Sequence, residues 1–165
     1  MELKLQLAGV LQSYGVPEFY MASRRTDTKP TLSAICGLIG NALGYEREDK
    51  EELDELINNI SIVSITNEKP IKILVDDQIA GTNGNVYVTA NRTDDNPNKT
   101  SPYPLIHKEY IEDNKFIVTI AGNDELMEKV KHALLYPRRP IHLGRKCCTG
   151  YEPILMEENH VSDSI

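Results

Sequence analysis

Apolar and polar residues alternate at the start of the chain, where Leu3, Leu5 and Leu7 are each followed by a polar or small residue. A period of two is typical of a strand that buries one face. The alternation stops at Ala8-Gly9. The pattern therefore predicts that the chain opens with a half-buried strand.

The apolar period then changes to that of a helix, which we expect to begin near Thr31 and to stop at Gly44. Gly37 and Gly40 lie inside this segment, and an interior glycine costs about 1 kcal/mol relative to alanine. We expect close packing of the helix against the sheet to compensate.

The remaining patterns predict a helix capped by Asp49, strands over 60–65, 71–75 and 115–120, a helix from Asn123 to Pro137, and a short strand over 141–143. This βαββαβ order predicts an α+β protein with a ferredoxin-like, RRM-like domain, a fold whose open sheet face and loops commonly hold RNA. The domain takes in residues 1–155, and 156–165 form a C-terminal tail.

A polar, turn-rich insertion over about 78–113 separates the two halves of this domain. Aromatic and cationic residues alternate through it: Tyr87, Arg92, Lys99, Tyr103, His107 and Lys108. Such pairs stack bases and hold phosphates in single-stranded nucleic acid, although a long polar loop can also be merely mobile.

Charge is distributed unevenly along a chain of 165 residues whose net charge is −7. Residues 46–55 hold seven acids and two bases, which is typical of a solvent-exposed helix, whereas 129–151 hold six Lys or Arg and no acid. The net charge argues against a simple basic nucleic-acid binder. The segregation nevertheless allows one surface to attract phosphate.

Two basic segments are candidates for that surface. Arg24, Arg25 and Lys29 precede the first helix, whose N-terminus favours anions. Arg145 and Lys146 lie between glycines that allow the backbone to approach a ligand. The alternative for this second segment is an ordinary basic surface turn.

Three cysteines without a CxxC spacing support neither a disulfide framework nor a zinc site, so we expect no metal and no cofactor. The N-terminus lacks the features of a signal peptide, and no apolar run approaches ~18 residues. We therefore expect a cytoplasmic protein without a membrane partner.

Four motifs together resemble the CRISPR-associated protein 5 family, most closely the form found in type I-E Cascade complexes. They are Leu-x-Leu-Ala-Gly-x-Leu-Gln-Ser-Tyr-Gly from Leu5, Ser-Arg-Arg-Thr from Ser23, Lys-Glu-Tyr-Ile-Glu-Asp from Lys108, and Pro-Arg-Arg-Pro-x-x-Leu-Gly-Arg-Lys-Cys from Pro137. They occur in order along residues 1 to about 155.

The resemblance implies a ferredoxin-like RNA-binding domain with an inserted β-rich thumb, which holds the 5′ handle of the guide RNA and caps a filament of backbone subunits. The implied partners are the guide RNA (crRNA), the Cascade backbone subunit and large subunit, and target DNA indirectly. The matching positions are Gln12, Ser13, Tyr14, Gly15, Arg24, Arg25, Gly144, Arg145 and Lys146.

Two other functions compete with this non-catalytic assembly role. Type I-C relatives cleave precursor guide RNA without metal, using Tyr, His and Lys, and this sequence offers Tyr45, His107 and Lys108. Side chains of these types suit general acid–base catalysis and a cation on the phosphorane. A separate enzyme normally processes the guide in type I-E systems, so we expect no catalysis. The second competing function is that of a module that binds only protein, but this function would not explain why the cations are segregated along the chain.

Overall fold

The computed structural model describes residues 1–16, 23–79, 82–83, 86–87 and 105–156, which form a mixed α+β protein. Within these residues the strands are β1 (Glu2–Gln12), β2 (Ser23–Arg24), β3 (Ser61–Asn67), β4 (Ile73–Ile79), β5 (Thr82–Asn83), β6 (Val86–Tyr87) and β7 (Leu105–Ala121). The helices are α1 (Leu32–Leu43), α2 (Lys50–Asn59) and α3 (Asp124–Leu135). None of these helices is long and apolar enough to cross a membrane.

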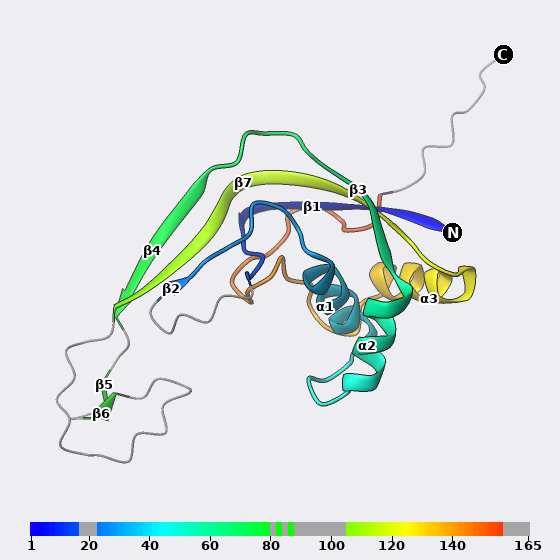
Figure 1. The fold of residues 1–165 in the computed structure, drawn as a ribbon, viewed down its shortest axis with the longest axis horizontal. Coiled ribbons are helices and arrows are strands. Elements are labelled where there is room, and N and C mark those ends of the chain that lie inside the picture. Colours follow the sequence, from blue (N-terminus) through cyan, green and yellow to red (C-terminus); the bar gives the residue numbers. More distant parts are fainter. Residues whose placement is uncertain (17–22, 80–81, 84–85, 88–104, 157–165) are drawn as a thin grey trace.

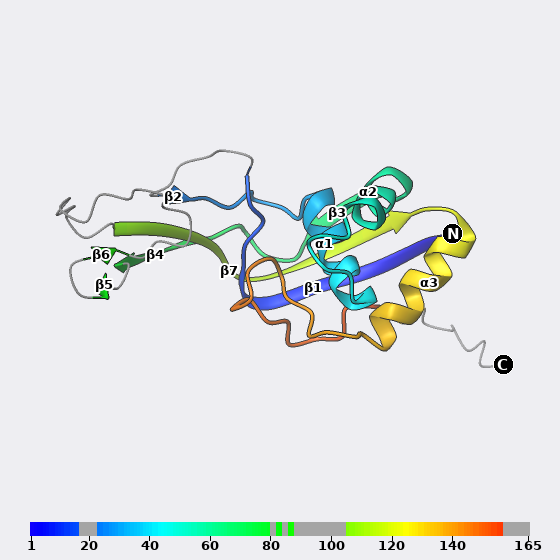
Figure 2. The same ribbon diagram turned by 90° about the horizontal axis from the view of Figure 1, so that it is seen from below.

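The long strand β7 is the spine of a five-stranded sheet, because each of the other four strands pairs with it (Figure 1). On one edge it pairs with β1 over 111–121 and then with β2 at 107–108. On the other edge it pairs with β3 over 116–121 and with β4 over 105–111. The first half of β7 therefore extends beyond the helices as an arm with β4 and β2 (Figure 2).

The core lies between the second half of the sheet and the helices, which cover one of its faces (Figures 1 and 2). Leu5 of β1 is opposite Val118 of β7, and Leu7 is opposite Phe116, and all four side chains are buried. The alternation predicted from the sequence is therefore confirmed. The strand continues to Gln12, further than the alternation indicated.

Local signals set the ends of α1 as predicted. The side chain of Thr31 accepts a hydrogen bond from Ala34 N–H, and Gly44 adopts a left-handed conformation with φ of 88°. The expected packing of the interior glycines against the sheet is wrong. A Cβ on Gly40 would lie 2.7 Å from Leu53 of α2, so its close contact is with a helix, and Gly37 is exposed with open space around it.

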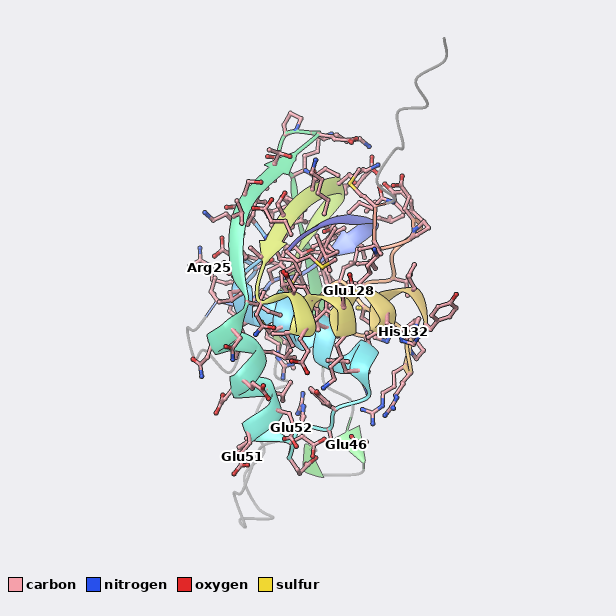
Figure 3. All side chains as sticks on the ribbon, turned by 90° about the vertical axis from the view of Figure 1, so that its right-hand side faces the viewer. Arg25, Glu46, Glu51, Glu52, Glu128 and His132 are labelled. Carbon is pink, nitrogen blue, oxygen red and sulfur yellow. The ribbon has the colours of Figure 1, made fainter. Side chains whose placement is uncertain are left out.

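The acidic run forms the solvent-exposed helix that its composition predicted. Glu51 and Glu52 project outward from α2, and Glu46 lies just before it (Figure 3). Leu56 is the buried residue of this helix. The acidic surface is thus the outward side of α2, away from the buried Leu56.

The second half of the chain differs from the predicted elements in two ways. The strand expected over 115–120 is the end of β7, which passes Asp113 without a break, so the insertion and the domain share one strand. The strand expected over 141–143 is absent from the described structure and leaves only an isolated bridge between His142 and Thr149. Instead, Gly150 and Leu155 form bridges with β1, which places the C-terminal segment along its outer edge.

Candidate nucleic-acid interface

The segment over 144–150, which begins and ends with glycine and is called here the glycine-rich loop, closes over the end of β1. Ser13 N–H donates to Leu143 O at 3.0 Å, and the next residue, Gly144, has φ of 97°. A Cβ at Gly144 would lie 1.7 Å from Ser13 O, closer than any side chain allows. Glycine is therefore required here for close backbone contact, as well as for its conformation.

A buried polar network fixes the residues that follow β1. The Gln12 side chain donates to Leu7 O at 3.1 Å and to Asn114 O at 2.6 Å, and it accepts from the Tyr14 hydroxyl at 2.5 Å. The Tyr14 ring packs edge-on against Phe116, with centroids 6.1 Å apart. Buried polar groups are stable only when they are paired in this way.

These contacts place three expected RNA-binding side chains inside the protein. Gln12, Ser13 and Tyr14 are 0%, 4% and 2% exposed, while Gly15 is exposed. The sequence motif resembles a recognition loop, but the tertiary fold turns the side chains of Gln12 and Tyr14 toward β7 and buries Ser13. They shape the interface from beneath, and direct contact of these side chains with RNA stays a prediction.

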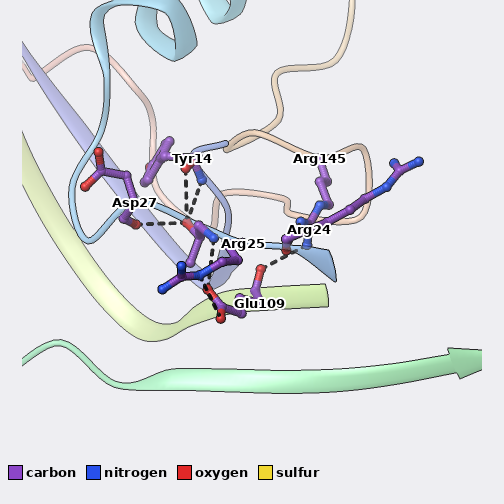
Figure 4. A network of polar contacts seen from close by, with 7 residues as sticks. Tyr14, Arg24, Arg25, Asp27, Glu109 and Arg145 are labelled. Carbon is purple, nitrogen blue, oxygen red and sulfur yellow. Dashed lines mark hydrogen bonds and ion pairs between the residues drawn. The ribbon is translucent and has the colours of Figure 1, made fainter. Parts of the chain in front are cut away.

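The basic segment is joined to this loop by Thr26. Its Oγ1 accepts Tyr14 N–H at 2.8 Å, and its own N–H donates to Glu109 Oε2 at 3.1 Å (Figure 4). Asp27 N–H donates to Tyr14 O at 2.6 Å. The segment before α1 is thereby held between the end of β1 and the arm of β7.

Arg145 connects the two basic segments. Its Nη1 donates to Glu109 O at 2.9 Å and its Nη2 donates to Arg24 O at 2.8 Å. The guanidinium also lies over the Tyr110 ring, 4.7 Å from the centroid, a distance at which cation–π attraction contributes. Arg25 forms an ion pair with the Glu109 carboxylate at 3.7 Å, so these two arginines make contacts within the protein.

Other cations of the two segments face solvent. Arg24, Lys29 and Lys146 are exposed, and the Arg24 side chain points away from the sheet (Figure 4). Residues 24 and 145 are 121 positions apart in sequence. The bond from Arg145 to the Arg24 carbonyl therefore joins the two basic segments, and we call their exposed cations, Arg24, Lys29 and Lys146, the cationic surface.

Burial raises the pKa of two tyrosines and one cysteine near this surface, Tyr14, Tyr110 and Cys148. Burial raises the pKa of Tyr14 far above its usual range, and burial, with the adjacent Cys147, raises the pKa of Cys148 to about 12. Burial also raises the pKa of Tyr110, whose hydroxyl lies 3.7 Å from Cys147 Sγ. The charge of this surface at neutral pH therefore comes from its arginines and lysines.

The three residues considered for catalysis are not brought together. The Tyr45 carbonyl accepts a hydrogen bond from Arg139 at 3.0 Å, beyond the C-terminus of α1. His107 and Lys108 lie on the arm of β7, where His107 contacts Asp77 at 2.5 Å and Lys108 donates to Gln78. Within the described residues no hydrogen bond joins Tyr45 to either of them.

Four candidate residues of the insertion have no described side chain. Arg92, Lys99 and Tyr103 lie outside the described residues. The backbone of Tyr87 belongs to β6, which pairs with β5. The expected RNA contacts of these four residues stay predictions.

Sequence reasoning missed Glu109, Thr26 and Tyr110, which organise the interface. All three lie inside motifs that carried the family resemblance, Ser-Arg-Arg-Thr and Lys-Glu-Tyr-Ile-Glu-Asp. Arg25 and Arg145 meet Glu109 only in the fold, so no signal in the neighbouring sequence indicates this carboxylate. No periodicity distinguishes such residues from ordinary members of a strand or loop.

Comparison with known proteins places the chain in a family. Residues 2–163 match the family described as CRISPR-associated protein (Cas_Cas5), and the chain belongs to this family. It is 28% identical to the CRISPR system Cascade subunit CasD of Escherichia coli (strain K12), over 98% of this chain and 72% of that protein.

Solved structures agree with this fold. A chain of a CRISPR RNA-guided surveillance complex superposes with a TM-score of 0.75 at 24% identity, covering 94% of this chain and 62% of that one. A crystal structure of a Cas protein superposes with a TM-score of 0.57, also at 24% identity, covering all of this chain and 67% of that one. The chain thus spans less than two thirds of the surveillance-complex chain that it matches.

Proposed function

We propose that this protein is a non-catalytic subunit of a type I CRISPR Cascade surveillance complex, in which it binds the 5′ handle of the guide RNA and caps the filament of backbone subunits. The observation that carries the proposal is the bond between Arg145 and the Arg24 carbonyl, which joins two basic segments into one surface. Family membership and the likeness to CasD supply the biological setting.

We also propose that the α+β domain has the ferredoxin-like arrangement of strands and helices. The C-terminal segment, β1, β7 and β3 lie in that order across the sheet, with α1 following β1 and α3 following β7. This order supports a ferredoxin-like domain whose last strand is reduced to isolated bridges. The arm of β4 and β7 is then the base of the inserted thumb.

The proposed partners follow from this role. They are the guide RNA, the backbone and large subunits of Cascade, and target DNA through the assembled complex. Exposed apolar residues on the arm, Ile73, Leu74 and Val75, are consistent with burial against another subunit. The separation of Tyr45 from His107 and Lys108 favours binding over cleavage.

Recovery of bound RNA tests the proposal. The full chain, purified from cells that express a CRISPR array and the other Cascade subunits, is expected to carry RNAs that share one fixed 5′ end. Arg24→Glu with Lys146→Glu should remove this RNA, because both exposed cations become repulsive to phosphate. Lys50→Glu with Lys129→Glu is the matched control, since it changes charge equally at exposed positions of α2 and α3.

Two results would contradict the proposal. If the Arg24→Glu with Lys146→Glu variant and its control recover equal amounts of RNA, the cationic surface does not bind the RNA. Site-specific cutting of repeat RNA by the purified chain, abolished by His107→Ala or Tyr45→Phe, would show an endoribonuclease instead.

A further inference from the structure

The edge of β7 has a gap in its strand pairing beside the cationic surface. The last pair of β1 is Gln12 with Ile111, and the nearest pair of β2 is Arg24 with Lys108. Glu109 and Tyr110 lie between these pairs and have no strand partner on this edge among the described residues. An unpaired strand edge leaves backbone polar groups that need partners.

Arg145 occupies this gap. One nitrogen of its guanidinium donates to Glu109 O within the gap, and the other donates to Arg24 O at the end of the neighbouring strand β2. Its flat face covers the Tyr110 ring. A planar fork can satisfy two carbonyls on separate segments while it stacks, which a single ammonium group cannot do.

From this arrangement, and resting on the proposed function, we propose that Arg145 is a positioning residue and that Arg24 makes the phosphate contact. In the sequence the two residues have the same expected role, because both are cations in basic segments. The structure distinguishes them: Arg145 is half-buried and bonded to two carbonyls, whereas the Arg24 side chain is exposed and points outward (Figure 4).

The glycine-rich loop is held independently of the Arg145 side chain. Leu143 N–H donates to Cys148 O at 2.7 Å, and Cys148 N–H donates to Arg145 O at 2.8 Å. These backbone bonds, together with the contact between the loop and Ser13, fix the position of Lys146. The position of Lys146 therefore does not depend on the Arg145 side chain, so Lys146 can serve as the control residue in the test.

Binding of the RNA that co-purifies with the wild-type chain, measured by filter binding over a range of salt, tests the proposal. Arg145→Lys keeps the charge but is expected to weaken binding and to reduce the salt slope by about 0.7, the value of one phosphate contact on a single strand. Arg24→Gln should have the same effect. Combined, the two changes should reduce the slope by about 0.7 rather than about 1.4, because they remove the same contact.

The matched control combines Arg145→Lys with Lys146→Gln, whose effects should add. Local amide hydrogen exchange in the RNA-free protein supplies a second measurement. It should accelerate at Thr26, whose N–H bonds Glu109, in Arg145→Lys but not in Lys146→Gln, while the urea midpoint verifies that each variant is folded.

Two outcomes would overturn the proposal: Arg145→Lys binding and exchanging like wild type, or additive losses for Arg145→Lys and Arg24→Gln. If no RNA co-purifies with the wild-type chain, the proposed function fails. The exchange at Thr26 then still decides whether Arg145 holds the segment.

Discussion

At the scale of single residues, the two basic segments are held by side chains that do not face the solvent. Gln12 and Tyr14 bond to each other beneath the loop, and Thr26 links the loop to Glu109. Removal of one partner would leave a buried polar group unsatisfied, which costs roughly 1–3 kcal/mol. The exposed cations depend on these residues for their positions.

Gly144 provides a direct test at this scale. Gly144→Ala is expected to destabilise the protein. The left-handed backbone conformation alone costs about 1–3 kcal/mol for alanine, and the clash of its Cβ with Ser13 O adds to this cost. Urea unfolding measures the change. Gly150→Ala is the control, since its Cβ would meet nothing closer than 3.4 Å, and equal stability of the two variants would contradict the close approach.

At the scale of elements, β7 holds the domain together while α1 and α2 pack around a glycine. The second half of β7 is paired on both edges by long strands, whereas its first half is paired by β4 and the two residues of β2. These differences in pairing give the two halves of one strand different local stabilities.

The contact between α1 and α2 gives a prediction for paired glycines. Gly40→Ala should cost about 1–3 kcal/mol through overpacking against Leu53. Gly37→Ala, on the exposed side of the same helix, should instead stabilise by up to about 1 kcal/mol, because alanine is the better helix former. Thermal or urea unfolding of both variants checks the expectation, and a stabilising Gly40→Ala would show that α2 is not in close contact.

Native-state hydrogen exchange should show the unequal halves of β7. Amides at 116–120 are expected to exchange slowest, since they lie between β1 and β3 over the core. Amides at 106–108 of the arm should exchange faster, because the residues of β4 opposite them, Asp76, Asp77 and Gln78, are polar and lie outside the buried core, so few apolar contacts protect them. Uniform protection along β7 would contradict this assignment.

At the scale of the whole molecule, buried cysteine thiols and a buried tyrosine hydroxyl make the stability of the fold sensitive to alkaline pH. Burial raises the pKa of Cys36 to about 11 and that of Cys148 to about 12, and it raises the pKa of Tyr14 further. Because these pKa values are higher in the folded state, their contribution is complete below the unfolded values of 9.0 and 10.0 and is lost as pH rises above them.

The urea midpoint is therefore expected to fall between pH 9 and 11. Each such group can lower stability by at most about 1.4 kcal/mol per pH unit in this range. Tyr14→Phe should be less stable at neutral pH, because Gln12 loses its donor, but its stability should fall less steeply above pH 10. If the stability of wild type and of Tyr14→Phe falls equally steeply with pH above pH 10, burial does not protect Tyr14 from ionisation.

Local order in this protein could be predicted from sequence because its causes lie within a few residues. The alternation around Leu5, the cap at Thr31 and the stop at Gly44 each depend on neighbouring positions, and the structure confirms all three. The motif resemblance also found both basic segments and the family. Periodicity and capping identify an element without information from the rest of the chain.

The tertiary structure alone decided which side chains of those motifs face solvent. Gln12 and Tyr14 are buried because β7 and the loop at Gly144 cover them, and β7 contains residues more than 100 positions away. Arg145 and Arg24 look equivalent in sequence, yet the gap in the edge of β7 takes one guanidinium into the fold and leaves the other outside. Burial and hydrogen-bond partners depend on contacts between distant segments, so no local pattern could have assigned these roles.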